Sequence, residues 1–337
     1  MRTIDWGQDR VVAIDQTRLP HELVLMRIDT VEGLVDAIKR LAIRGAPALG
    51  AAGALGVALA ARLYAADPAT VAAAAVAVRK ARPTAVNLAW GVDRAMGRLP
   101  EGADAVLAEA LAVLEEDVAA NRALSERGAL WLMRHVDGPV AVQTHCNAGA
   151  LACVEWGTAL GVVRALRERG ALGHVYAAET RPLLQGARLT AWELAQMNVA
   201  HTLVVDSAAA SVLAHGLANA VVVGADRVTA NGDVINKVGT FPLALAAAHA
   251  RVPMVVAAPE STIDVSTPTG AEVDIEIRGA DEIARWGDVK VAPDGTETLN
   301  YAFDVTPAAL VAAIVTERRV ILPALGGRPD DPPAADR

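Results

Sequence analysis

Much of the first 135 residues consists of apolar segments of helical character, and after Thr30 the apolar residues recur every three or four positions, which is the spacing of one face of a helix. Between Thr30 and Leu41 this spacing predicts a helix that ends at a turn before Pro47. Residues 3–27 instead contain short apolar pieces around a proline and predict a small β-element. The N-terminal part of the chain is therefore predicted to be mainly helical. Further helices are predicted over residues 46–64, 67–81 and 103–135.

The pattern changes at Asp137-Gly138-Pro139, after which short apolar runs alternate with segments of helical character such as 187–197. Strands that alternate with helices are typical of a parallel, doubly wound α/β sheet. We therefore expect a mainly helical N-terminal domain over residues 1–136, an α/β domain over 137–325 and a disordered tail over 326–337. The five apolar runs predicted to be strands are residues 140–142, 175–178, 203–205, 220–223 and 254–258.

Glycines at regular spacing mark the second predicted helix, at Gly50, Gly53 and Gly56. Because glycine has no side chain, another backbone can approach this face of the helix. Close helix packing is the favoured interpretation, and direct contact with a ligand is the alternative. The helix is apolar enough to suggest a membrane span, but a proline and an arginine interrupt it, so we predict a buried helix. No GxGxxG or P-loop pattern follows a strand, which argues against a nucleotide cofactor.

The composition restricts the classes of partner. The 337 residues are 53% hydrophobic, carry a net charge of −8 and contain no dense run of lysine or arginine, so nucleic acid and anionic membranes are disfavoured as partners. The two cysteines, Cys146 and Cys153, have neither CxxC spacing nor clustered histidines, which disfavours a zinc site and a disulfide framework. No secretory signal is recognised at the N-terminus. We expect a cytoplasmic protein without a metal.

Polar and ionisable residues follow each of the five predicted strands, while the strands themselves contain almost none. In an open α/β sheet, ligands bind beyond the carboxyl ends of the strands. Five polar strand ends at one edge therefore predict a binding site. The residues at these ends are Thr144-His145-Cys146-Asn147, Glu179-Thr180-Arg181 with Gln185, Asp206-Ser207, Asp226-Arg227 and Glu260-Ser261-Thr262.

Two of these residues are candidates for chemistry. Cys146 is predicted to lie in a turn between a strand and a helix, where free backbone N–H groups and the helix dipole would lower the pKa of its thiol. An inert thiol is the alternative, and Cys153 is expected to belong to the core. Asp226 follows an apolar strand, so burial would raise the pKa of its carboxyl and make it a proton donor. The alternative is an ion pair between Asp226 and Arg227.

Positively charged residues near the same edge suit a phosphate group in this otherwise acidic protein. The candidates are Arg44, Arg82, Arg181 and Lys237, and Asn236 adds an amide beside Lys237. We therefore predict that this edge of the sheet can hold a phosphate.

These residues fall within motifs that occur in order from residue 44 to residue 264 and that resemble the methylthioribose-1-phosphate isomerase family. The wider superfamily includes regulatory subunits of translation initiation factor 2B and ribose-1,5-bisphosphate isomerases. The long motif at 179–194, together with Cys146 and Asp226, favours the methylthioribose branch. One departure is Ala178, where the family pattern has an acidic residue. The matching motifs are residues 44–48, 82–88, 144–149, 179–194, 224–228, 231–240 and 258–264.

The resemblance implies an aldose–ketose isomerase that converts 5-methylthioribose 1-phosphate to 5-methylthioribulose 1-phosphate in L-methionine salvage. It also implies a Rossmann-like C-terminal domain, a homodimer, a sugar phosphate as the small-molecule partner, and no metal or nucleotide cofactor. The family's catalytic cysteine corresponds to Cys146 and its proton-donating aspartate to Asp226. Its substrate contacts correspond to Arg44, Gly45, Ala46, Arg82, Gln185, Asn236 and Lys237.

Opening the sugar ring of such a substrate needs a proton on the ring oxygen, which we assign to Asp226. Cys146 would then serve the transfer of hydrogen from C2 to C1. The sequence does not choose between hydride transfer and an enediol-type intermediate, although an apolar wall would favour the hydride. An isomerase of 5-deoxyribose 1-phosphate or ribose 1,5-bisphosphate is one alternative. A non-catalytic regulatory subunit is another, and the presence of both Cys146 and Asp226 argues against it.

Overall fold

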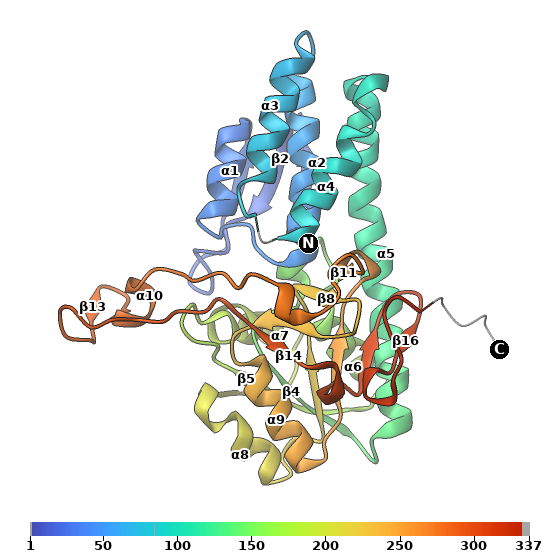
Figure 1. Ribbon diagram of the computed structural model, residues 1–337, viewed down its shortest axis with the longest axis vertical. Helices are drawn as coiled ribbons and strands as arrows, with labels where there is room; N and C mark the ends of the chain where they lie inside the picture. The colour runs from blue at the N-terminus through green and yellow to red at the C-terminus, as the bar shows by residue number, and fades with distance from the viewer. Residues whose placement is uncertain (1, 84, 332–337) are drawn as a thin grey trace.

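The computed structural model describes residues 2–83 and 85–331. Figure 1 shows a tall group of helices from the N-terminal part of the chain, standing on a lower domain built around a β-sheet. The chain begins with a three-stranded antiparallel sheet, which confirms the small β-element predicted for residues 3–27. Its strands are β1 (Ile4–Gly7), β2 (Arg10–Ile14) and β3 (Leu25–Ile28).

Five helices follow the small sheet. Thr30 caps the first of them, because its side-chain oxygen accepts a hydrogen bond of 3.1 Å from the Gly33 N–H. The structure confirms the four helices predicted from the sequence and adds α4, which was not predicted. The helices are α1 (Val31–Lys39), α2 (Ala46–Leu63), α3 (Pro68–Arg79), α4 (Val86–Met96) and α5 (Ala103–His135).

The central helix of this group is α2. It is long and apolar enough to cross a membrane by length and composition alone, yet 83% of it is buried inside the protein. A Cβ added to Gly53 would lie 2.5 Å from the backbone oxygen of Leu88 on α4, and a Cβ added to Gly91 on α4 would lie 2.0 Å from the backbone oxygen of Gly50. The two backbones meet where neither has a side chain, so the predicted buried helix and its close packing are confirmed.

The lower domain is built on a seven-stranded sheet with the strand order β16-β15-β10-β7-β4-β5-β6. All neighbouring strands are parallel except β16, which runs antiparallel at one edge. The direction of winding reverses between β4 and β7, and this switch point is where doubly wound sheets bind ligands. The predicted α/β sheet and its five predicted strands are confirmed. The strands are β4 (Val140–Thr144), β5 (Leu172–Ala178), β6 (His201–Val204), β7 (Ala220–Val223), β10 (Met254–Ala257), β15 (Ala313–Val315) and β16 (Val320–Ile321).

Helices cover both faces of this sheet. On one face, apolar residues of α5 and α6 (Ala159–Glu168) pack against inward-facing residues such as Val142 and Val175. On the other face, α8 (Ala209–Ala214) and α9 (Thr240–Ala250) pack against the alternate residues, such as Val221. Because side chains alternate between the two faces of each strand, they contribute to two separate hydrophobic cores.

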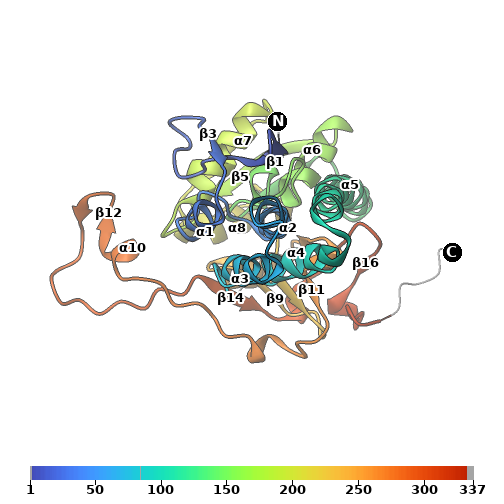
Figure 2. The ribbon, with the colours of Figure 1, turned by 90° about the horizontal axis from the view of Figure 1, so that it is seen from above.

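A smaller sheet with the strand order β11-β8-β9-β14 has no counterpart in the sequence analysis. The chain between β11 and β14, residues 265–302, is called the arm below; its first residues contact the smaller sheet, and its outer part reaches to one side in Figures 1 and 2. The strands are β8 (Arg227–Thr229), β9 (Val234–Lys237), β11 (Ile263–Asp264) and β14 (Phe303–Thr306), and the arm carries α10 (Asp281–Ala284), β12 (Arg285–Trp286) and β13 (Val289–Lys290).

The long helix α5 joins the two halves of the molecule. Its residues up to Val118 belong to the core of the N-terminal helices, and from Leu124 onward they belong to the core of the large sheet. The boundary after residue 136 therefore stays a prediction. Residues 326–331 of the predicted tail contact the body through Arg319, which donates to the Pro329 oxygen at 2.8 Å, and residues 332–337 lie outside the described part of the chain.

The segment after β4 departs from the prediction. No helix follows the turn that contains Cys146: residues 150–152 form one 3₁₀ turn, and α6 begins only at Ala159. Gly149 and Gly157 instead pair as an isolated antiparallel bridge, which folds the segment into a loop. The placement of Cys146 at a helix N-terminus is therefore wrong.

Candidate active site

Three adjoining cavities lie between the N-terminal helices and the carboxyl ends of the strands, and Asp226 lines all three. The two larger cavities have volumes of about 290 Å³ and 310 Å³. Each residue that the family resemblance assigns to catalysis or substrate binding lines at least one of them, so the structure brings that set together, whereas Arg181 lines none of the three. The 290 Å³ cavity, called the central cavity below, is lined by Arg44, Gly45, Arg82, Cys146, Gln185, Asp226 and Lys237, while Ala46 and Asn236 line the smallest cavity.

The loop before α2 supplies Arg44 and Gly45. Gly45 caps α2 with φ = 98°, a conformation that favours glycine, and a Cβ there would lie 2.4 Å from the backbone of Ala152. Arg44 points toward the cysteine loop: its guanidinium donates to the side-chain oxygen of Asn147 at 2.6 Å and to the backbone oxygen of Asn147 at 2.8 Å. The start of α2 and this guanidinium together favour an anion.

Cys146 is held in a left-handed backbone conformation, with φ = 61°. Its N–H donates to the Thr180 hydroxyl oxygen at 2.9 Å, and its carbonyl oxygen accepts from the Thr190 hydroxyl at 2.6 Å. Thr180 also has a positive φ, of 67°. Such conformations cost ~1–3 kcal/mol each and persist where surrounding contacts hold them, often at functional sites.

The Cys146 thiol is buried, at 8% exposure, and its sulfur lies 3.9 Å from Nη2 of Arg44. Burial raises the pKa of this thiol, Arg44 and Lys237 lower it, and Asp226 raises it further. The net direction is upward, so the predicted lowering is wrong. No helix begins at Cys146 to favour the thiolate, and burial outweighs the two cations.

Asp226 follows β7, and its N–H donates to the Ile235 oxygen on β9 at 2.9 Å. Burial raises the pKa of the Asp226 carboxyl, although Lys237, Arg82 and Arg44 act in the opposite direction. The raised pKa is the one expected for a proton donor. Arg227 pairs with Asp264 at 3.5 Å, so the alternative in which Arg227 neutralises Asp226 is not the arrangement observed.

Lys237 and Asn236 reach the site from the end of β9. The Lys237 ammonium donates to the Ala302 oxygen at 2.7 Å and lies 4.6 Å from the centre of the Phe303 ring. Burial lowers the pKa of Lys237. Asn236 donates to the Thr240 hydroxyl oxygen at 3.0 Å, which fixes its amide beside the start of α9.

Arg82 and Gln185 complete the predicted set, whereas Arg181 does not line the central cavity. Arg82 lies 3.4 Å from Glu276 at the base of the arm. Gln185 precedes a π-helical turn over residues 186–190, a local irregularity that often occurs at functional sites. Arg181 instead donates to the Glu282 oxygen at 3.2 Å and lies over the Trp286 ring, so its cation contacts the arm.

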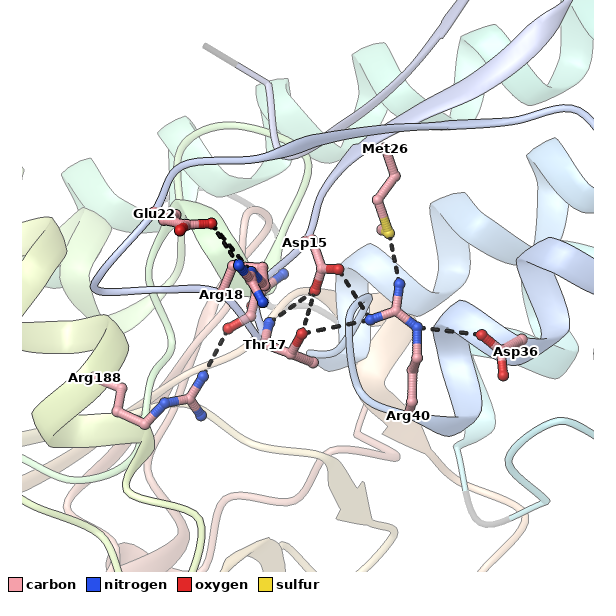
Figure 3. Close-up of polar contacts among 9 residues, drawn as sticks. Asp15, Thr17, Arg18, Glu22, Met26, Asp36, Arg40 and Arg188 are labelled. Carbon is pink, nitrogen blue, oxygen red and sulfur yellow. Dashed lines mark hydrogen bonds and ion pairs between the residues drawn. The ribbon is translucent and has the colours of Figure 1, made fainter. Parts of the chain in front are cut away.

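The central cavity has further polar residues that the sequence analysis misses. Figure 3 shows two arginines at this edge in different surroundings: Arg40 is held by Asp15 and Asp36, whereas Arg188 turns toward backbone oxygens. Arg188 lies within the motif at 179–194, which is the one signal that pointed to it. The missed polar residues are Gln16, Thr17, Arg40, Arg188 and Arg278.

Cationic side chains predominate in the lining of the central cavity, although Arg40, Arg82 and Arg278 are also paired with carboxylates outside it. Among the described residues, six cationic side chains line it against one carboxylate, that of Asp226. This arrangement suits an anionic ligand such as a phosphate ester. Within residues 2–83 and 85–331, no group of three or more histidine, cysteine, aspartate or glutamate side chains is placed to hold a metal ion. The cations are Arg40, Arg44, Arg82, Arg188, Lys237 and Arg278.

Comparison with protein families places this chain in a known group. The model of the Initiation factor 2 subunit family matches residues 42–323, which include all the predicted site residues. The chain belongs to the Initiation factor 2 subunit family. This membership accounts for the order of the motifs between residues 44 and 264.

Three curated relatives of this chain carry the names of enzymes. A probable bifunctional methylthioribose-1-phosphate isomerase/methylthioribulose-1-phosphate dehydratase from Nocardia farcinica is 52% identical over 95% of this chain, and the chain spans 60% of that protein's length. A methylthioribose-1-phosphate isomerase from Anaeromyxobacter sp. (strain K) is 51% identical over 94% of this chain and 92% of its own length. A 5-deoxyribose 1-phosphate isomerase from Moorella thermoacetica is 48% identical over 95% of this chain and 94% of its own length.

Solved structures of similar fold carry two kinds of name. The 5-methylthioribose 1-phosphate isomerase from Pyrococcus horikoshii OT3 is 38% identical, with a TM-score of 0.87 over 96% of this chain and 92% of that one. Subunit delta of translation initiation factor eIF-2B from A. fulgidus is 43% identical, with a TM-score of 0.84 over 96% of both chains. The fold is therefore shared by proteins named as enzymes and as initiation factors, and the site residues must separate the two functions.

Proposed function

We propose that this chain isomerises 5-methylthioribose 1-phosphate to 5-methylthioribulose 1-phosphate, an aldose-to-ketose conversion in L-methionine salvage. The observation that carries the proposal is 51% identity to a methylthioribose-1-phosphate isomerase over 92% of that protein's length. The chemistry of the cavity agrees with it, because Cys146 and Asp226 line the same space as a set of cations.

The cations hold the phosphate of the substrate. Arg44 stands at the start of α2, and Lys237 enters from β9 with an ammonium that contacts one backbone oxygen and a ring face. Both would gain a charge-assisted hydrogen bond to phosphate oxygens. Arg82 completes the group, and the backbone N–H groups at the start of α2 add their dipole.

Asp226 protonates the ring oxygen, which opens the sugar. A carboxylic acid performs this step only while it carries its proton, and burial raises the pKa of Asp226 so that the protonated form persists to higher pH. Protonation breaks the bond between the ring oxygen and C1, a hydride then moves from C2 to C1, and the C2 hydroxyl becomes the ketone carbonyl as its proton returns to the Asp226 carboxylate. The carboxylate left on Asp226 is compensated by the nearby cations.

Cys146 serves the hydrogen transfer as a neutral thiol. Burial keeps its pKa above the ordinary value, so the thiol keeps its own proton and can donate a hydrogen bond to a substrate oxygen during the transfer. Leu183, Leu189 and Phe303 form an apolar part of the wall. Such a wall limits exchange with water and favours transfer of the hydrogen as a hydride.

A second candidate substrate is 5-deoxyribose 1-phosphate, because the relative from Moorella thermoacetica has that activity in its name and is 48% identical. The two substrates differ only in the group at carbon 5. A non-catalytic regulatory role is less well supported, since such a role does not need a thiol and a carboxyl in one cavity.

The proposal is tested by kcat/KM for 5-methylthioribose 1-phosphate, 5-deoxyribose 1-phosphate and ribose 1,5-bisphosphate, with the ketose product followed by NMR. We expect the methylthio substrate to be preferred by ~10-fold or more, which is the size of discrimination that one apolar group provides. A preference for the deoxy sugar would favour the second candidate. No turnover of any of the three would contradict an isomerase.

We further propose that the chain acts in the cytoplasm as a homodimer, as the family resemblance implies. The arm supports a second copy as partner, because large apolar side chains are exposed along it. Light scattering of the purified protein at micromolar concentration would test the dimer, and a monomer would contradict it. The exposed residues are Val265, Ile277, Trp286, Val289, Val291, Leu299 and Tyr301.

A further inference from the structure

A chain of buried polar contacts runs from α7 (Ala191–Gln196) to Arg44 behind Cys146. Glu193 on α7 is 7% exposed and accepts hydrogen bonds from the Asn147 amide at 2.8 Å, the Ala150 N–H at 2.7 Å and the Leu151 N–H at 3.3 Å. Asn147 in turn accepts from Arg44 at 2.6 Å. Two hydrogen bonds through Asn147 thus link a buried carboxylate to the guanidinium that lies 3.9 Å from the Cys146 sulfur.

The hydrogen-bonding chemistry of Glu193 and Arg44 fixes the orientation of the Asn147 amide between them. An ionised carboxylate only accepts hydrogen bonds and a guanidinium only donates them, so the amide nitrogen must face Glu193 and the amide oxygen must face Arg44. Turning the amide over would break both contacts. The position of Arg44 is therefore coupled to the position of Glu193.

The loop backbone lies directly on the Glu193 carboxylate. A Cβ added to Gly149 would lie 2.3 Å from one carboxylate oxygen and 2.4 Å from the other. Burial raises the pKa of Glu193, and the three donated hydrogen bonds and the charge of Arg44 act in the opposite direction. The net direction for the pKa of Glu193 is upward, while all three contacts are donated to the carboxyl, which is the pattern that an ionised carboxylate makes.

We propose that Glu193 is a positioning residue that, through Asn147, holds the guanidinium of Arg44 against the sulfur of Cys146. The inference rests on the function proposed above for Cys146. A cation held at this distance opposes the effect of burial, so it keeps the pKa of the neutral thiol lower than burial alone would set it. The other groups facing the thiol are the Lys237 ammonium and the Asp226 carboxyl, and those facing Glu193 are Arg44 and the Cys153 thiol.

The rate of alkylation of Cys146 by iodoacetamide as a function of pH tests this proposal without any substrate. Cys153 is replaced by alanine throughout so that one thiol reacts. Glu193→Gln keeps the size of the side chain and removes its charge, and we expect the midpoint pH of alkylation to rise by ~0.5–1 unit as Arg44 loses its fixed position. Glu168→Gln, on the surface of α6 beside Arg164, is the matched control and leaves the midpoint unchanged.

Two further variants separate positioning from a merely structural role. Asn147→Ala breaks the link to Arg44 but leaves Glu193 its two backbone hydrogen bonds, and it is expected to raise the midpoint in the same way. If Glu193→Gln does not fold, the alkylation midpoint of Asn147→Ala alone tests the proposal. Arg44→Met removes the cation, and adding Glu193→Gln to it is expected to cause no further shift, because Glu193 acts through Arg44.

An unchanged midpoint in a folded Glu193→Gln or Asn147→Ala protein would overturn the proposal. A shift that adds to the shift of Arg44→Met would also overturn it. Lost turnover with a normal alkylation midpoint would make Glu193 a structural residue. Because alkylation needs no sugar phosphate, these results are independent of which substrate the enzyme takes.

Discussion

Replacing Gly45 with alanine tests whether the loop before α2 and the cysteine loop are packed as one unit. The φ of Gly45 is 98°, and a Cβ there would lie 2.4 Å from both the Cα and the backbone oxygen of Ala152. Gly102 provides a matched control. It caps α5 with a φ of 97°, but a Cβ added to it would meet nothing within 4 Å.

The two substitutions share a cost in backbone strain, but only Gly45→Ala also creates a steric clash. Both place alanine in a backbone region that costs ~1–3 kcal/mol. Gly45→Ala must also displace Ala152, which adds ~1–3 kcal/mol of overpacking. We therefore expect the free energy of unfolding to be lower for Gly45→Ala than for Gly102→Ala by that second amount, ~1–3 kcal/mol.

The same difference is expected in activity. Gly45 lines the central cavity, so a shift of its loop moves Arg44 and Cys146 relative to each other, and kcat/KM should fall by ~10-fold or more, equivalent to ~1.4 kcal/mol. Gly102→Ala should retain the wild-type kcat/KM. The assays are urea unfolding followed by circular dichroism and turnover of 5-methylthioribose 1-phosphate. Equal unfolding free energies for the two variants, or a wild-type kcat/KM for Gly45→Ala, would refute the reasoning.

Three further predictions concern the chemistry of the site and of the core. Deuterium placed at C2 of the substrate should be retained at C1 of the product, because the cavity has apolar walls, and NMR that showed washout to solvent would contradict hydride transfer. Lys237→Met should raise KM by ~10-fold or more through the lost phosphate contact, and an unchanged KM in steady-state assays would remove Lys237 from the binding set. Burial raises the pKa of Asp117 to about 6, above the ~3.9 of an unfolded chain. Its ionisation therefore destabilises the fold as the pH rises from about 4 to about 6. Across that range, the free energy of unfolding of Asp117→Asn should rise by up to ~2 kcal/mol relative to that of the wild type. Urea unfolding at pH 4.5 and 7.5 measures this gain, and an equal effect at both values would count against it.

Much of the fold follows from local pattern. Helices such as α1 have apolar residues at helical spacing, and buried elements such as α2 and β7 are continuous apolar runs; both are properties of consecutive residues. The smaller sheet has no such signal, because β8 and β9 are very short and β14 pairs with β9 from the far side of the arm, with Phe303 opposite Lys237. The alignment of such strands depends on contacts between distant segments.

The site was predictable where it depends on strand ends and motifs. Cys146 and Asp226 follow β4 and β7, which are neighbours at the switch point of the sheet, so the strand-end rule brings them together. The backbone conformation of Cys146 was not predictable, because Thr180 and Thr190 hold it from more than thirty residues away. The raised pKa of the Cys146 thiol was not predictable either, because it results from burial in the folded protein and not from the local sequence.

The most direct test of the account is the conversion of 5-methylthioribose 1-phosphate by the purified protein, followed by NMR, in the wild type and in Cys146→Ala and Asp226→Asn. The account predicts formation of 5-methylthioribulose 1-phosphate by the wild type, and turnover reduced by ~10³-fold or more in each variant, with binding of inorganic phosphate largely retained. Near-wild-type kcat in either variant, or no product from the wild type, would contradict it.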